Sequence, residues 1–155
     1  MARHASSPSP PSQSRHVPLH HPLRFPAAAL LLIAGIAHIP ITPEHLEEAP
    51  YIGILFIALT VVCFALALML LRHDTPLVWT AVVAVTVAAV LTYLVSRMTA
   101  LPQIADDVGN WTDPLGLVSI ASEFLAATLA AAALASRQAQ KSATGTNRYS
   151  RAANR

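Results

Sequence analysis

Apolar residues fall into four long runs along the chain, at 25–39, 51–71, 77–96 and 115–136. The second and third runs contain no charged residue, and Glu123 is the only charge in the fourth. A helix rises about 1.5 Å per residue, so about 20 residues cross a hydrocarbon core of about 30 Å. The last three runs reach this length, and none of the four carries the polar stripe of a surface helix. The pattern predicts transmembrane helices at about 25–40, 50–71, 77–97 and 115–136.

These runs predict an all-α fold, a transmembrane four-helix bundle at residues 23–136. Backbone groups in lipid must satisfy their own hydrogen bonds, which favours helices over isolated strands. The third run is rich in Val and Thr, which favour strands in water, but its length and lack of turn residues indicate a helix. The flanking segments, 1–22 and 137–155, are predicted to be disordered cytoplasmic tails. The first is rich in Ser, Pro and His, and the second is polar and basic.

Composition supports a membrane location and excludes several functions. Of the 155 residues, 54% are hydrophobic and only 12% are charged, whereas a soluble domain is about 25% charged. A lone cysteine, Cys63, excludes a disulfide framework. The chain contains no GxSxG, P-loop, GxGxxG, HExxH or CxxC motif. Basic and aromatic residues do not alternate, so we expect no nucleic-acid partner.

The first run also fits a second interpretation. Arg15 and Arg24 precede it, and Gly35-Ile36-Ala37 resembles the small-residue cleavage site of a signal peptide. Cleavage would leave three spans. The apolar stretch continues past Ala37, which favours retention. Both interpretations stay open at this point.

The basic residues predict the orientation in the membrane. Four spans place one basic residue, Arg97, on one side and nine on the other: Arg3, Arg15, Arg24, Arg72, Arg137, Lys141, Arg148, Arg151 and Arg155. The loops on the side of Arg97 carry six acids: Glu44, Glu47, Glu48, Asp106, Asp107 and Asp113. The positive-inside rule then predicts a multi-pass protein of the cell membrane with both termini in the cytoplasm.

Polar residues in the outer half of the predicted bundle form a candidate site. Glu123 lies eight residues into the fourth run, where an ionised carboxylate facing lipid costs about 2.5–3.5 kcal/mol. It should therefore face the other helices. Ser119 lies one helical turn away, Ser96 and Arg97 end the third helix, and His38 ends the first. We predict that these five residues converge, either as a pocket for a proton, metal ion or polar headgroup, or as an Arg97–Glu123 ion pair that joins two helices.

Prolines mark where helices end and begin. Pro40 and Pro43 should end the first helix, and Thr42-Pro43 suits the start of a short helical turn. Asp113-Pro114 is a favourable start for the fourth helix, because the carboxylate caps free N–H groups and proline fits the first turn.

The first outer loop also holds candidate metal ligands. Imidazole and carboxylate together suit Zn, Cu, Fe or Ni, so His38, His45 and Glu48 form a candidate ligand set for a divalent cation. Their spacing matches no known zinc signature, and a solvated acidic loop is the alternative. The cofactor therefore stays unknown.

Two outer segments read AHIPITPEHLEEAPYIGILF, at 37–56, and YLVSRMTALPQIADDVGNWTDPLGLVSIASE, at 93–123. They resemble an uncharacterised group of small four-helix integral membrane proteins from high-GC bacteria. The resemblance covers roughly residues 25–136 and excludes the tails. It implies membrane location and four spans. It brings no activity, so no catalytic residue is carried over.

Three functions follow as hypotheses. The first is a non-enzymatic membrane protein whose acidic extracytoplasmic face binds a protein partner, a second copy of the chain, a cation or a lipid headgroup. The second is a small transporter or metal-handling protein that uses the outer His, Glu and Arg residues. The third is a membrane oxidoreductase subunit, which the absence of paired core histidines and of CxxC disfavours.

Overall fold

The computed structural model describes residues 21–153, with side chains to residue 143, and this part of the chain is all-helical without a β-strand. The helices are α1 (Arg24–His38), α2 (Thr42–Glu48), α3 (Pro50–Arg72), α4 (Pro76–Met98) and α5 (Pro114–Ala153), with a 3₁₀ turn η1 (Ala105–Asp107). The predicted all-α class is therefore confirmed. Three of these helices, α3, α4 and α5, are long and apolar enough to cross a membrane. Helices α1 and α2, bent by 47° at their junction, pass the same test as a pair.

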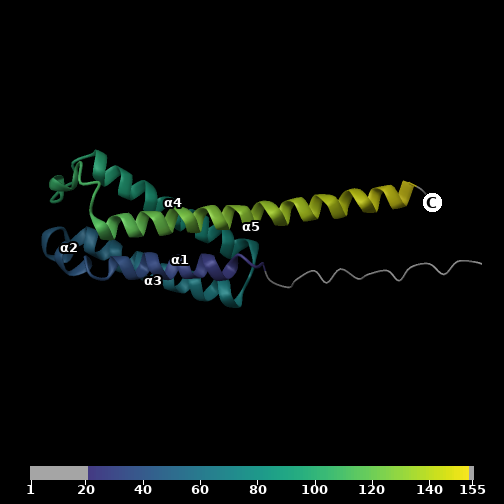
Figure 1. The fold of residues 1–155 in the computed structure, drawn as a ribbon, viewed down its shortest axis with the longest axis horizontal. Coiled ribbons are helices and arrows are strands. Elements are labelled where there is room, and N and C mark those ends of the chain that lie inside the picture. The colour runs from purple at the N-terminus through teal and green to yellow at the C-terminus, as the bar shows by residue number, and fades with distance from the viewer. Residues whose placement is uncertain (1–20, 154–155) are drawn as a thin grey trace, which may run out of the picture.

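The C-terminal region differs from its prediction. Residues 137–155 were expected to be disordered, yet α5 continues without a break to Ala153 and contains 40 residues. Residues 137–143 are mostly Ala, Gln, Lys and Arg, which favour a helix that is already nucleated. At 1.5 Å per residue, α5 is about 60 Å long, and it projects well beyond the other helices (Figure 1). The predicted disorder of 1–22 falls almost wholly outside the described residues.

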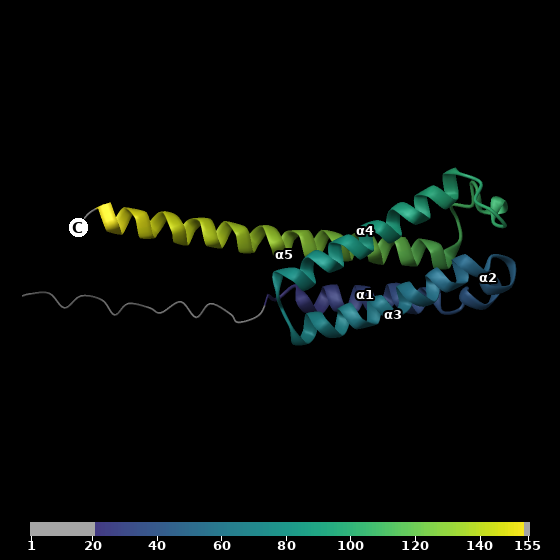
Figure 2. The same cartoon turned by 180° about the vertical axis from the view of Figure 1, so that it is seen from behind.

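Four helices, α1, α3, α4 and α5, lie side by side. Helix α1 packs against both α3 and α5, α4 packs against α5, and the short α2 folds back on α3. Helices α3 and α4 are close at the turn that joins them. From there α4 crosses α5 and diverges from α3 towards the end of the molecule that carries α2 and η1 (Figure 2). We call this end the α2 end.

Small residues let the helices approach closely. The buried core includes alanines from α1, α3 and α5, with larger side chains such as Leu31, Leu70 and Trp79 between them. Small side chains at helix contacts allow close backbone packing in lipid. Large apolar side chains instead cover the outer surface, as at Ile54, Val61 and Phe124, each about three-fifths exposed. An apolar surface this extensive suits contact with lipid.

Gly53 allows α2 to fold back on α3. Ala49, at the junction of the two helices, is fully buried. A Cβ at Gly53 would lie 2.6 Å from Cγ of Leu46 and 2.8 Å from its backbone nitrogen. Because backbone cannot move aside as a flexible side chain can, only glycine fits this approach without shifting α2.

Gly53→Ala is expected to destabilise the protein by a net amount of about 1–3 kcal/mol, the usual cost of overpacking. The helix propensity of alanine favours the variant by about 1 kcal/mol, so any net loss reports on the contact with Leu46. Thermal unfolding of the detergent-solubilised protein measures the change. Ile54→Ala, at the exposed neighbouring position, is the matched control. Equal melting temperatures for Gly53→Ala and the native chain would contradict the close approach.

Candidate functional site

A cavity of about 540 Å³ lies among the helices at the α2 end. Helices α3 and α4 both supply apolar side chains to its walls. From α3 these are Leu55, Leu59 and Val62, and from α4 Val85, Ala88 and Ala89. All five residues of the predicted polar cluster line the same cavity: His38, Ser96, Arg97, Ser119 and Glu123. The sequence therefore identified the polar part of this wall, although it did not reveal the apolar part.

Three of the five residues form one hydrogen-bonded chain. The hydroxyl of Ser119 donates to Oε1 of Glu123 at 3.1 Å, and Oγ of Ser119 also lies 3.3 Å from Nε2 of His38. The other ring nitrogen of His38, Nδ1, donates to the carbonyl of Ala34 at 2.8 Å. The three side chains are 2–6% exposed. We call these three side chains the polar floor of the cavity.

Arg97 lies on the cavity wall and pairs with Asp107 rather than with Glu123. Its Nη1 lies 2.5 Å from Oδ1 of Asp107 and donates to the carbonyl of Asp107 at 3.3 Å. Its guanidinium also lies 4.9 Å from the centre of the Tyr93 ring. The prediction of an Arg97–Glu123 ion pair is therefore wrong, because Arg97 pairs with Asp107. Asp107 is 22% exposed, so pairing there desolvates less charge than pairing with the buried Glu123 would.

Ser96, the remaining member of the predicted cluster, is separate from the polar floor. Its hydroxyl donates to the carbonyl of Tyr93 at 2.9 Å, within its own helix. The loop after α4 is held by two hydrogen bonds that do not involve Ser96. The N–H of Gly109 donates to the carbonyl of Arg97 at 3.0 Å, and the hydroxyl of Tyr51 donates to the carbonyl of Pro102 at 2.7 Å. The second bond joins the start of α3 to the loop after α4.

The predicted metal set is not assembled. Nowhere in residues 21–153 do three or more His, Cys, Asp or Glu side chains gather in a way that could hold a metal ion. His38, His45 and Glu48 all line the cavity. However, Nδ1 of His45 bonds to the carbonyl of Ile41 at 2.9 Å, as that of His38 does to Ala34. Each imidazole packs against the Phe56 ring, at 4.9 and 5.0 Å between centres. Both imidazoles are thus held by their own helix backbone and by the Phe56 ring.

The start of α5 agrees with its prediction. Oδ2 of Asp113 accepts the backbone N–H of Gly116 at 2.7 Å, and Pro114 is the first residue of the helix. This is the expected cap with proline in the first turn.

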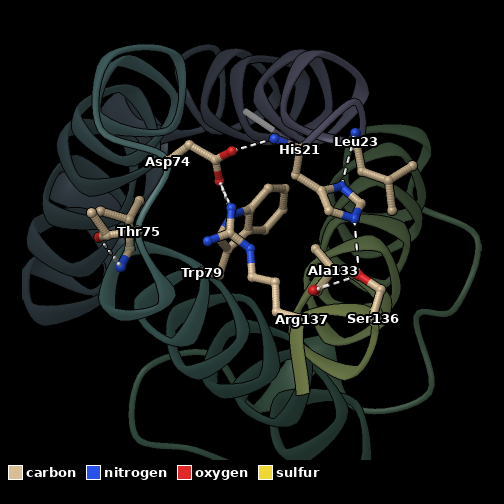
Figure 3. A network of polar contacts seen from close by, with 9 residues as sticks. His21, Leu23, Asp74, Thr75, Trp79, Ala133, Ser136 and Arg137 are labelled. Atoms are coloured by element: carbon tan, nitrogen blue, oxygen red, sulfur yellow. Dashed lines mark hydrogen bonds and ion pairs between the residues drawn. The ribbon is translucent and has the colours of Figure 1, made fainter. Parts of the chain in front are cut away.

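A second polar network, at the opposite end, was not foreseen. The carboxylate of Asp74, 1% exposed, forms an ion pair with Arg137 and accepts the backbone N–H of His21. It also accepts the indole N–H of Trp79 at 2.5 Å (Figure 3). Nε2 of His21 lies 3.0 Å from Oγ of Ser136. One side chain therefore joins the segment before α1, the α3–α4 turn and α5.

Sequence reasoning missed this network because Arg137 was interpreted only as a marker of orientation. The available signal was a carboxylate, Asp74, within the short turn where basic residues gather. None of the residues in this network lines the cavity. We therefore assign the network a structural role and the cavity the candidate function.

Asp74→Asn should lower the free energy of unfolding by about 3 kcal/mol, because it leaves the charge of Arg137 without its buried partner. Trp111→Phe, as a background, leaves Trp79 as the only tryptophan, so its fluorescence reports on the lost indole bond. Thermal unfolding and the Trp79 emission maximum are the measurements. Arg72→Gln, an exposed change beside the same turn, is the control. Native-like unfolding of Asp74→Asn would show that the network does not join these segments.

Comparison with known proteins gives no match to a family model, a curated protein or a solved structure. The resemblance to small four-helix membrane proteins from high-GC bacteria therefore stays a prediction. Function has to be inferred from the geometry of the cavity.

Proposed function

We propose that this chain is a multi-pass protein of the cell membrane, a transmembrane four-helix bundle in which α1 and α2 together form a bent first span. Packing of α1 against both α3 and α5 supports its retention as part of the bundle. The charges support termini in the cytoplasm. Arg72, Arg137 and Lys141 lie at or beyond the end that holds the α3–α4 turn, whereas the α2 end carries the six acids.

We further propose that the protein is a non-enzymatic binding component that takes up an amphipathic molecule from the bilayer. The observation that carries this proposal is the cavity, which combines the polar floor, from α1 and α5, with apolar walls from α3 and α4. Binding sites typically combine apolar walls with a few fixed polar groups that orient the ligand. A molecule with a polar head and an apolar tail matches both surfaces, and the divergence of α4 from α3 suits entry from the lipid.

Reporter fusions test the proposed orientation. We expect alkaline phosphatase to be inactive when fused after Arg72 or at the C-terminus, and active when fused after Met98. Green fluorescent protein at the C-terminus should fluoresce. Phosphatase activity at the C-terminus together with inactivity after Met98 would reverse the orientation.

Photocrosslinking tests binding in the cavity. A neutral monoacylglycerol with a diazirine in its acyl tail is added to the full chain in nanodiscs, and labelled peptides are mapped by mass spectrometry. We expect labels on the cavity faces of α3 and α4. Ala89→Phe should reduce this labelling roughly tenfold, equivalent to about 1.4 kcal/mol of binding, because the ring fills the cavity.

Ala84→Phe provides the control for that experiment. It makes the same change on α4, at an exposed position that does not line the cavity. Labelling spread evenly over the lipid-facing surface, and equal in both variants, would show only contact with annular lipid and would contradict the proposed pocket.

A further inference from the structure

The charges around the cavity indicate what kind of head group it accepts. Its lining includes six carboxylates: Glu44, Glu48, Asp106, Asp107, Asp113 and Glu123. Among the described residues Arg97 is the one Arg or Lys on this wall, and Asp107 already neutralises it. Asp113 is engaged as the cap of α5. A ligand therefore meets an excess of negative charge, which repels an anionic head.

Glu123 is the carboxylate that lies deepest in this arrangement. It is 2% exposed, and within residues 21–143 it receives one hydrogen bond, from Ser119, and no ion pair. Ion pairs in that region join Arg97 to Asp107 and Arg137 to Asp74. A carboxylate within a membrane span normally pairs or lines a functional site. Because charges interact more strongly where water is excluded, a cationic head beside Glu123 would be held firmly.

Aromatic rings on the cavity wall add a second preference for positive charge. Tyr93 holds the guanidinium of Arg97 over its ring, 4.9 Å from the ring centre, and Phe56 supplies a second aromatic ring to the cavity wall. Ring faces attract cations, including quaternary ammonium groups. A bare metal ion would gain nothing from the apolar walls, and its ligand set is not assembled.

We propose that the cavity selects an organic monocation with an apolar tail, whose ammonium-type head lies against Glu123 and whose tail lies between α3 and α4. This inference rests on the proposed function, because it specifies the head group of the amphipathic ligand. Glu123 is then a binding residue that recognises charge, and Ser119 holds its carboxylate in position.

Three crosslinkers with the same diazirine tail and different heads test this proposal on the full chain in nanodiscs. The heads are trimethylammonium, the neutral glycerol ester and carboxylate. We expect labelling of the cavity by the ammonium probe at roughly tenfold lower concentration than by the neutral probe, and least labelling by the carboxylate. Glu123→Gln, which preserves shape and can still bond Ser119, should abolish the ammonium advantage, measured as the ratio of ammonium to neutral labelling within the same variant.

Glu47→Gln is the matched control, because Glu47 lies in α2 between cavity carboxylates Glu44 and Glu48 but does not itself line the cavity. It should retain the ammonium advantage. Equal cavity labelling by the ammonium and neutral probes, or an advantage that survives in Glu123→Gln, would overturn the charge preference and leave the pocket itself intact. Failure of all three probes to label the cavity would overturn the proposed function as well.

Discussion

Polar groups among apolar helices have no water to bond, and this constraint organises the described part of the chain. Hydroxyls within the helices return to their own backbone, as when Thr86 donates to the carbonyl of Val82 at 2.7 Å. Charged groups pair near the two ends, Asp74 with Arg137 and Arg97 with Asp107. The first pair joins the α3–α4 turn to α5, whereas the second joins α4 only to the segment that follows it.

The two ends consequently serve different purposes. At one end, three residues connect α3 to α4, and Asp74 within that turn also bonds to α5. These contacts keep the helices close. At the α2 end, a 15-residue segment, 99–113, connects α4 to α5 and is folded back by Arg97 and Asp107. Helix α4 can therefore diverge from α3 at the α2 end, while the short turn keeps the two helices close at the other end. We attribute the cavity to this divergence.

The features that the sequence predicted depend on local pattern. Apolar runs defined the helices, Pro43 marked α2, and Asp113 marked the start of α5. The Asp74 network was not predictable in this way, because two of its partners, His21 and Arg137, lie 53 and 63 residues from Asp74 along the chain. The sequence positions alone also could not distinguish Asp107 from Glu123 as the partner of Arg97. The fold of the segment after α4 decides between them.

The contrast between Asp74 and Glu123 separates structure from binding. Asp74 bonds three segments, so its burial is offset by contacts that hold the fold together. Glu123 bonds Ser119, four residues away on the same helix. Among the described residues, hydrogen bonding in the polar floor links α5 to another helix through the 3.3 Å contact between Ser119 and His38. A buried carboxylate that joins so little is costly to stability, and apolar replacements are often better tolerated at such positions. A ligand that supplies the missing positive charge gives this residue a physical reason to lie in the cavity.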